Sequence, residues 1–556
     1  MKEFFRKYRI EILIIVIGVL FFFPFLGEVH LFDWDEINFA EAAREMMVTG
    51  DYLTVRIDFK PFHEKPPLFI WFQVLSMKVF GVNEFAARFP NAVLGIITLL
   101  FLYTIGKKHY RDEKFGILWV LAYLGSFLPH FYFKTGIIDP AFNLFMFSSV
   151  YFWFRYFADK QMKYIYIAAA LDGMAILTKG PVGFLLVFMA VAVFWFSENR
   201  KIKIPFKALI IFTSLAFIPI VTWYAAVLIN TDPALMDEFI DYHLRLLTTG
   251  DAGHKGFFLY HFVVLLLGCF PASILMFRGI VRQPDDSESQ HLFKNMNLFL
   301  LAVVLVIFTI VKTKIVHYSS LAYFPVTFLA ARAMYGILFR EIRWKISTNI
   351  LVLIFGLIYA LLFTLLPLAL MNADMLLPKI SDEFTKALLR ANAGWQGYEY
   401  LIGLLFFIVI VLTLVYMFKH NYLKSFLVLF GGTALTIFIF LPWIAPKIER
   451  YTQGATIEFY EQIQDEEAYV YALGFKSYAQ YFYTRKSIDE SAYALGMPYG
   501  EFRDWLMNEP VDKPAYFVAK NNKAGRYLEH PFLEEIYRKN GFVFIKRINP
   551  EAFLAE

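Results

Sequence analysis

Long apolar segments separated by short polar ones run through most of the chain. Each apolar segment approaches the roughly 20 residues that a helix needs to cross the hydrocarbon core of a bilayer. The expected spans are 10–27, 88–106, 116–133, 140–157, 163–178, 181–197, 207–229, 257–277, 297–312, 315–336, 347–370, 399–418 and 424–442. The pattern predicts a mainly α, polytopic membrane protein with about 13 transmembrane helices.

Beyond the last apolar segment the pattern changes. Short aromatic and β-branched runs such as EEAYVYAL predict strands, whereas GEFRDWLMNE has helical spacing. We therefore expect a transmembrane domain over residues 1–442 and a small soluble α/β domain over 443–556. The first of these includes a long outer loop, 28–87, with amphipathic juxtamembrane helices.

Basic residues are concentrated on one side of these segments. They lie at the N-terminus and in the loops 107–114, 155–163, 198–207, 278–294 and 339–345. By the positive-inside rule that side is cytoplasmic. The loop 28–87 and the C-terminal domain are then extracytoplasmic.

Composition narrows the class of protein and of partner. Of the 556 residues, 58% are hydrophobic and 18% charged, which is too apolar for a soluble protein and makes membrane lipids the expected surroundings. The net charge of +5 is modest and spread over loops, so no nucleic acid partner is expected. The single cysteine, Cys269, excludes an intramolecular disulfide and a cysteine metal cluster.

The stretch FDWDEINFAEAAREM, residues 32–46, places many carboxylates directly after the first apolar segment. Asp33 is a candidate helix N-cap, with Glu36 closing a capping box. An apolar stripe opposite a polar face predicts an amphipathic helix on the membrane surface. Capping does not account for Asp35, which lies beside Trp34 at an apolar–aqueous boundary where a carboxylate can act as a general base.

Cations and further polar residues recur at the other outer loops. Lys65 lies between Glu64 and two prolines, and Lys179 lies in LTKGP; an interfacial lysine that extends into water is the commoner role for both. Asp139 precedes Pro140 as an ordinary N-cap would. The remaining candidates are His243 and Arg245 in one outer loop, and Lys314, His317 and Tyr318, whose spacing places them on one helix face. Their convergence on one side of the membrane favours binding of a phosphate group.

A metal site is a weaker hypothesis. His63, Glu64, His243 and His317 could converge, and imidazole with carboxylate suits zinc. The paired-histidine spacing of a dedicated site is missing. We therefore predict no certain cofactor, with a divalent metal such as zinc as the remaining option.

Five motifs occur in a characteristic order. They are DE-x-x-x-AE-x-x-REM followed by G-D, then EKPP, IIDP, LTKGP and K-x-x-HY. This set resembles the GT-C glycosyltransferases of the ArnT/PMT superfamily, which includes the bacterial aminoarabinose transferases of lipid A and the protein O-mannosyltransferases. The resemblance runs from about residue 10 to 330 by motif, and over the whole chain by architecture.

The resemblance implies a GT-C fold and transfer of a sugar from a polyprenyl-phosphate carrier to an acceptor at the outer face. It also implies a bacterial cytoplasmic (inner) membrane, with the C-terminal domain in the periplasm. It implies that Asp35 is the catalytic carboxylate, that Lys65 and Lys179 bind the donor phosphate, and that His243 and Tyr318 line the cavity.

The chain also departs from the aminoarabinose transferases. They usually carry Arg and Tyr where this chain has Asn38 and Phe39, and Tyr where it has Phe62. These differences leave the sugar and the acceptor open.

The residues and the resemblance together predict an integral-membrane glycosyltransferase. The donor is an undecaprenyl-phosphate-linked sugar and the acceptor is lipid A or a related envelope glycolipid, with inversion because the acceptor attacks opposite the leaving phosphate. The expected catalytic group is Asp35, Glu36 and Asp139. The expected substrate-binding group is Lys65, Glu64, Lys179, His243, Arg245, Lys314, His317 and Tyr318.

Three alternatives remain. Glycosylation of envelope proteins, as in the protein O-mannosyltransferases, is the main one within the enzyme class. A transporter or flippase of lipid-linked substrates commonly shows repeated halves and charges near the bilayer midplane. Here the ionisable residues lie at span ends and no internal repeat is evident. A non-catalytic scaffold is the third.

Overall fold

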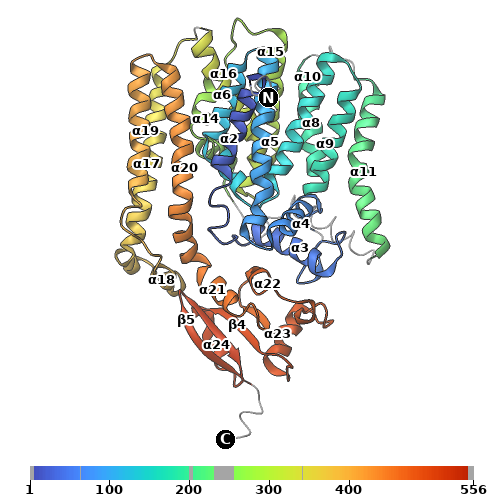
Figure 1. Ribbon diagram of the computed structural model, residues 1–556, viewed down its shortest axis with the longest axis vertical. Coiled ribbons are helices and arrows are strands. Elements are labelled where there is room, and N and C mark those ends of the chain that lie inside the picture. The colour runs from blue at the N-terminus through green and yellow to red at the C-terminus, as the bar shows by residue number, and fades with distance from the viewer. Residues whose placement is uncertain (1–5, 63, 199–203, 231–255, 341, 549–556) are drawn as a thin grey trace.

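The computed structural model describes residues 6–62, 64–198, 204–230, 256–340 and 342–548. The chain forms a bundle of long helices with a smaller domain of helices and strands at one end (Figure 1). The helices of the bundle are α2 (Arg9–Phe22), α5 (Glu84–Tyr110), α6 (Glu113–Leu124), α7 (Phe127–Phe131), α8 (Asp139–Asp159), α9 (Lys163–Lys179), α10 (Val182–Ser197), α11 (Phe206–Asn230), α13 (Tyr260–Gly268), α14 (Ala272–Ile280), α15 (Glu288–Ile310), α16 (Tyr323–Phe339), α17 (Ile346–Met371), α19 (Leu401–Phe418) and α20 (Tyr422–Thr452). Short 3-10 turns η1 (Tyr132–Lys134) and η3 (Val316–Ala322) complete it.

Every segment expected to span the membrane lies on helix, but the count of 13 is not confirmed. Within the described residues, 7 helices are long and apolar enough to cross a bilayer, or up to 9 if each of two sharply bent helix pairs forms one span. The difference has a physical reason. Helices α2, α9 and α10 contain 14, 17 and 16 residues, fewer than the roughly 20 that reach across the hydrocarbon core. Helix α8, with 21 residues, is long enough but not apolar enough.

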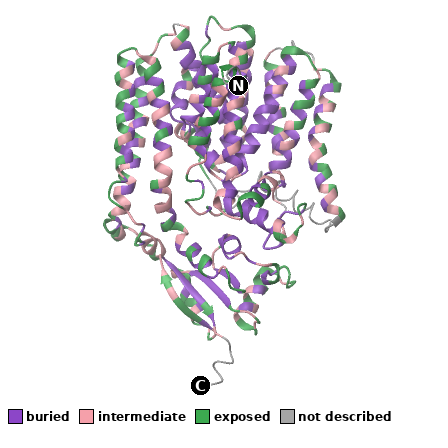
Figure 2. Cartoon of the chain, in the orientation of Figure 1, coloured by how far each residue is buried: buried purple, intermediate pink, exposed green. Residues whose placement is uncertain are grey.

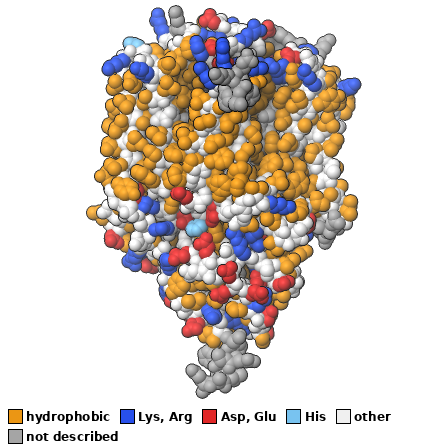
Figure 3. Space-filling model, viewed as in Figure 1, with side chains coloured by type: hydrophobic (Ala, Val, Ile, Leu, Met, Phe, Trp, Pro, Cys, Tyr) orange, Lys and Arg blue, Asp and Glu red, His pale blue; other side chains and the backbone are white. Residues whose placement is uncertain are grey.

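The polar ends and the apolar middle of the bundle are clearly separated. Figure 3 shows a broad hydrophobic belt between two charged ends, with Lys and Arg gathered at the end where the N-terminus lies. Figure 2 shows that the central helices are largely buried, whereas α17 and α19 keep exposed faces. Those faces carry apolar residues such as Ile354, Leu361 and Leu404. An exposed apolar belt of this kind is what contact with lipid requires.

The segment between α2 and α5 is a group of short elements. It contains α3 (Asp35–Thr49), the short hairpin β1 (Arg56–Ile57) and β2 (Lys60–Pro61), and α4 (Leu68–Phe80). Helices α3 and α4 lie beneath the bundle, at the end opposite the N-terminus (Figure 1).

The C-terminal region is built around a mixed sheet of four strands in the order β3-β4-β6-β5. Strands β3 and β4 are parallel and the other pairs antiparallel. Its elements are α21 (Gly454–Gln462), β3 (Tyr469–Leu473), α22 (Ala479–Tyr483), η6 (Ile488–Glu490), α23 (Tyr499–Asn508), β4 (Ala515–Lys520), α24 (Asn521–Leu528), β5 (Leu533–Lys539) and β6 (Phe542–Arg547). The connection between α17 and α19 adds η4 (Ala373–Met375), η5 (Leu377–Lys379) and α18 (Glu383–Leu389). Helix α20 is continuous through residue 442 to Thr452, so the last bundle helix leads directly into this region.

Candidate functional site

The first turn of α3 differs from the predicted capping box. The helix begins at Asp35, and Trp34 occupies the N-cap position. Asp33 instead accepts hydrogen bonds from the backbone N–H of Tyr478, at 3.2 Å and 3.3 Å to its two carboxylate oxygens. The prediction was wrong because a backbone donor of the C-terminal region takes the carboxylate that would otherwise have capped the helix.

Glu36 is held inside the protein by a two-point ion pair with Arg88. The Arg88 Nε lies 2.9 Å from Oε1 and its Nη2 lies 2.8 Å from Oε2. The backbone N–H groups of Phe32 and Gly136 donate to the same carboxylate. Burial works to raise the pKa of Glu36, but the charge and hydrogen bonds of Arg88 outweigh it and hold the pKa below its usual range. Glu36 therefore joins α3 to α5 and to the loop before α8, which makes it a positioning residue rather than a proton carrier.

The polar face of α3 is buried, not exposed to water as an amphipathic surface helix predicts. Arg44 forms an ion pair with Glu41 at 2.7 Å, and the same guanidinium donates to the backbone oxygen of Lys486 at 2.9 Å. Glu45 accepts from the backbone N–H of Phe59 at 2.9 Å. The C-terminal region thus covers the face that the sequence pattern assigns to solvent.

The contact of Asp33 with the C-terminal region makes stability depend on pH. Burial raises the pKa of Asp33 to about 6, although Ser477, Tyr478 and Lys476 favour its charged form. Because an unfolded aspartate has a pKa of about 3.9, this raised value stabilises the fold fully at low pH, and the stabilisation is lost as pH rises through about 6.

We expect Asp33→Asn to remove the loss of stability that the parent protein shows as pH rises. The variant-minus-parent difference in thermal midpoint should be about 1 to 3 °C more positive at pH 7 than at pH 5. Differential scanning fluorimetry of both proteins in detergent measures it. An equal difference in thermal midpoint at the two pH values would contradict the raised pKa of Asp33.

Asp35 lies beside a histidine at the lower end of the bundle. Its side chain is 45% exposed, and its Oδ2 lies 3.8 Å from Nε2 of His317, whose side chain is only 16% exposed. His317 is held in place through η3, because its backbone oxygen accepts from Ser320, whose hydroxyl accepts from Asn143 of α8 at 2.8 Å. A carboxylate that is accessible and faces a partly buried imidazole can accept or stabilise a proton.

A second ion pair lies next to this one. Helix α8 begins at Asp139 itself, and its Oδ1 lies 2.6 Å from Nζ of Lys179, the last residue of α9. The ammonium also lies 5.5 Å from the ring centre of Tyr318. The predicted N-cap role of Asp139 is therefore replaced by a buried pair that fixes the lysine.

Lys65 belongs to the same charged group. Its charge and that of His317 both act on Asp139, and Asp35 and Lys65 both act on His317. The structure thus brings together Asp35, Asp139, Lys65, Lys179, His317 and Tyr318 of the predicted site. Glu64, the neighbour of Lys65, lines a pocket toward the C-terminal region instead.

Lys314 has a different position from the one expected. Its Nζ donates to the backbone oxygens of Phe308, Thr309 and Val311 at 2.7 to 2.8 Å. These bonds cap the C-terminal end of α15 and use all three ammonium protons. The expected shared helix face is wrong because Lys314 precedes the 3-10 turn that carries His317.

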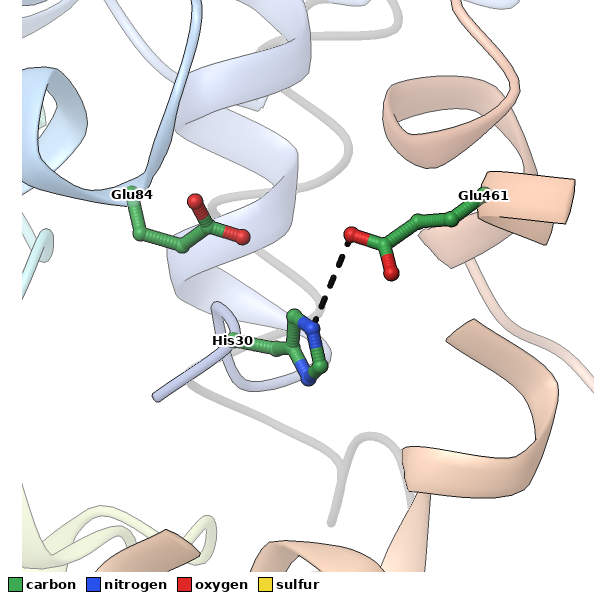
Figure 4. A group of neighbouring side chains, drawn as sticks. All are labelled: His30, Glu84 and Glu461. Atoms are coloured by element: carbon green, nitrogen blue, oxygen red, sulfur yellow. Dashed lines mark ion pairs between the residues drawn. The ribbon is translucent and has the colours of Figure 1, made fainter. Parts of the chain in front are cut away.

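The remaining candidates lie outside the described residues. They are His63, His243 and Arg245, so the expected zinc group of His63, Glu64 and His243 is represented only by Glu64. Within the described part of the chain, one trio with metal-ligand geometry is His30, Glu84 and Glu461 (Figure 4). Burial lowers the pKa of His30, but hydrogen bonds with Glu449 at 3.1 Å and with Glu461 raise it to about 10. The imidazolium is therefore the cation that these carboxylates share.

Two groups in the site were not identified from the sequence. Arg88, the partner of Glu36, opens a predicted span, and an arginine at the first position of an apolar segment was the available signal. Lys476, on the C-terminal region, lies 5.0 Å from the ring centre of Trp34. Its distance along the chain from Trp34 gave no signal at all.

Comparison with known proteins finds partial matches in sequence. Residues 64–223 match the family model described as dolichyl-phosphate-mannose-protein mannosyltransferase. The undecaprenyl phosphate-alpha-4-amino-4-deoxy-L-arabinose arabinosyl transferase of Edwardsiella ictaluri is 27% identical over 287 residues, 49% of this chain and 51% of its own. The protein of the same name from an Enterobacter species is 26% identical over 310 residues, 54% of each chain.

The fold agrees over a longer stretch. The crystal structure of ArnT from Cupriavidus metallidurans bound to undecaprenyl phosphate superposes with a TM-score of 0.76 and 18% identity, covering 97% of this chain and 98% of that one. The chain is therefore similar to these proteins in sequence over part of its length and in fold over nearly all of it.

The sequence matches to curated proteins are partial. The chain spans about half the length of the two arabinosyl transferases, and 61% of an uncharacterised Aquifex aeolicus protein that is 25% identical to it. The matched mannosyltransferase family model covers Lys65, Asp139 and Lys179, whereas Asp35 and His317 lie outside the matched region.

Proposed function

We propose that the protein is a membrane glycosyltransferase that moves a sugar from a polyprenyl-phosphate-linked donor to lipid A or a related envelope glycolipid. The observation that carries the proposal is the charged group at the lower end of the bundle. An accessible carboxylate, Asp35, faces His317 at 3.8 Å, and a lysine fixed by Asp139 at 2.6 Å lies beside them. The names of the arabinosyl transferases and the undecaprenyl phosphate in the ArnT structure support the same donor class.

The reaction needs two kinds of group, and the cluster offers both. The acceptor oxygen attacks the anomeric carbon, its proton passes to the Asp35 carboxylate, and the bond between that carbon and the donor phosphate oxygen breaks. The electron pair leaves with the polyprenyl phosphate, whose negative charge Lys65 and Lys179 stabilise. Attack opposite the leaving phosphate inverts the anomeric carbon.

The position of Asp35 near the end of the hydrophobic belt suits a lipid-linked substrate. Asp35 opens α3, which lies beneath the bundle at the end of the hydrophobic belt (Figure 3). A polyprenyl chain can remain among the apolar helices while its phosphate reaches the lysines at headgroup level.

A protein acceptor is the second candidate. The matched family model, which is described as a protein mannosyltransferase, favours it. The chemistry at Asp35 and the lysines would be the same for a serine or threonine hydroxyl, so the two candidates differ only in what occupies the acceptor side.

Removing either lysine charge is expected to weaken binding of polyprenyl phosphate about 10- to 100-fold, because a hydrogen bond to a charged group contributes about 1.5 to 3 kcal/mol. Lys65→Met keeps the apolar stem of the side chain. Lys179→Met is combined with Asp139→Asn, so that no buried carboxylate is left unpaired. Isothermal titration in detergent measures the affinity.

Lys78→Met is the matched control, since Lys78 lies near the end of α4, 4.2 Å from the ring centre of Tyr52. It should bind as the parent does. Parental affinity in Lys65→Met and in the double variant would make both residues ordinary interfacial lysines and remove the proposed phosphate site.

A further inference from the structure

A histidine and two glutamates converge where the outer loop, the bundle and the C-terminal region meet. His30 lies in the segment between α2 and α3, Glu84 is the first residue of α5, and Glu461 lies near the end of α21. One ligand atom from each of the three lies within 4.8 Å of the others. Figure 4 shows the two carboxylates pointing toward one another across the edge of the imidazole. The cluster therefore draws on three segments that are far apart in the sequence.

A fourth side chain orients the imidazole. Nδ1 of His30 lies 3.1 Å from Oε1 of Glu449, whose side chain is only 5% exposed. An acceptor at this distance takes the Nδ1–H of the neutral ring, so the lone pair of Nε2 is directed toward Glu461. Histidines that bind metals are commonly held in this way, by a carboxylate on the nitrogen that does not bind the metal. The ring of His30 is thus already oriented as a ligand.

The spacing of the cluster suits a shared ion better than a direct hydrogen bond. Nε2 of His30 lies 3.7 Å from Oε1 of Glu461, beyond the roughly 2.7 to 3.2 Å of a well-formed hydrogen bond. Ligand atoms around a tetrahedral zinc ion, each about 2.0 to 2.2 Å from the metal, lie about 3.5 Å from one another. The side chain of Glu461 is 48% exposed and that of His30 31%, so an ion can enter from solvent.

The charge balance also favours a dication. Three carboxylates surround one imidazole, so negative charge remains in excess even when His30 is protonated. Arg88 and Arg485 both act on Glu84, but Arg88 forms its ion pair with another glutamate and Arg485 shares its charge in the same way. A divalent ion would neutralise more of this charge than one proton does. Its binding displaces the proton of His30 to solvent, as binding to any imidazole requires.

We propose that His30, Glu84 and Glu461 bind a divalent transition-metal ion such as Zn²⁺, with Glu449 orienting the imidazole and water completing the coordination. Imidazole together with carboxylate suits zinc, whereas Mg²⁺ and Ca²⁺ prefer oxygen ligands alone. The site shares no residue with the zinc group expected from the sequence, and it does not depend on the proposed glycosyltransferase function.

The role of such an ion would be structural. Through His30 it would hold the segment that leads into α3, and through Glu461 it would tie that segment to the C-terminal region. The backbone oxygen of His30 already accepts from Arg88 of α5 at 3.0 Å, so the same residue contacts the bundle. The ion would therefore fasten the C-terminal region to the bundle just before Asp35, without taking part in the chemistry there.

Zinc titration of the full-length protein tests the site. The protein is stripped with a chelator in detergent and titrated with Zn²⁺ at pH 8, where protons compete less for the imidazole. Glu461→Gln, and separately Glu84→Gln, should weaken binding at least 10- to 100-fold, because losing even a hydrogen-bonded partner of a ligand has that effect. Glu458→Gln is the matched control, since Glu458 lies on the same helix in a surface pair with Lys539. Equal zinc affinity in Glu461→Gln and Glu458→Gln would overturn the metal site.

Hydrogen–deuterium exchange tests the structural role. Zn²⁺ should slow exchange in peptides covering residues 23–34 and 454–463 of the parent and of Glu458→Gln, but not of Glu461→Gln. Mg²⁺ at the same concentration should have no such effect. Zinc that binds through Glu461 yet leaves exchange in both segments unchanged would overturn the proposed fastening of the two parts. Neither measurement uses sugar transfer, so either outcome is independent of the proposed function.

Discussion

Asp35→Asn is expected to lower the rate of sugar transfer by about a hundredfold to ten-thousandfold, the usual effect of losing a general base. The substitution is nearly isosteric, but the amide carries no charge and accepts no proton at neutral pH. Because the Asp35 side chain is half-exposed and faces His317 at 3.8 Å, its replacement leaves no buried charge without a partner. Stability and donor affinity should therefore stay close to parental values while turnover is lost.

Asp33→Asn provides the control two residues away. Asp33 accepts its hydrogen bonds from the backbone N–H of Tyr478, and an amide oxygen can accept the same bonds. That variant should retain transfer at pH 7. Steady-state assays of both variants with a labelled lipid-linked donor make the comparison. Near-parental turnover in Asp35→Asn would remove the proposed base from the charged group, since Glu36 is held by Arg88 and Asp139 by Lys179.

Arg88→Met is expected to lower the free energy of unfolding by about 3 to 5 kcal/mol, because it leaves the Glu36 carboxylate buried and unpaired. Arg88 is 4% exposed and also donates to the backbone oxygens of Leu26, Val29 and His30. Its loss therefore affects the loop before α3 as well as α3 itself. Thermal and denaturant unfolding in detergent measure the change.

The partner substitution separates charge from packing. Glu36→Gln in the Arg88→Met background removes the uncompensated carboxylate and should recover a large part of the lost stability. If the single Arg88 variant unfolds within about 0.5 kcal/mol of the parent, the range of an ordinary surface substitution, the pair does not hold α3 in place.

Much of the bundle could be predicted from hydrophobic segments alone. Each expected span lies on helix because burial in lipid needs a continuous apolar run, and that requirement is visible in the sequence. The number of membrane-spanning helices was harder to predict from the sequence. Short helices such as α10, and bent pairs such as α13 with α14, which meet at 105°, satisfy the same pattern without each being a full-length straight span.

Residues of the candidate site could be predicted where one motif contains both the residue and its sequence neighbours. Charge interactions link Asp35, Lys65 and Lys179 through His317 and Asp139, so the structure brings these predicted residues together. Predictions failed where the partner comes from elsewhere in the chain. Asp33 lost its capping role to Tyr478, 445 residues away, and the polar face of α3 is covered by the segment around Lys486.

Local geometry explains the case of Lys314. Spacing of three and four residues implies a shared face only when the residues lie in one helix, and Lys314 precedes the 3-10 turn that begins at Val316. The lysine then points back to the end of α15, where the last carbonyl groups of a helix need donors. A sequence pattern does not distinguish a lysine that caps a helix from one that binds phosphate.

The most direct test of the account follows the phosphate of the donor. Purified protein is reconstituted in vesicles with an undecaprenyl-phosphate-linked aminopentose and lipid A, and ³¹P NMR distinguishes the donor phosphodiester from a released phosphomonoester. The account predicts that polyprenyl phosphate monoester appears in step with sugar-bearing lipid A, and that Asp35→Asn abolishes both. Donor that reaches the opposite leaflet with its phosphodiester intact would contradict the account and identify a flippase.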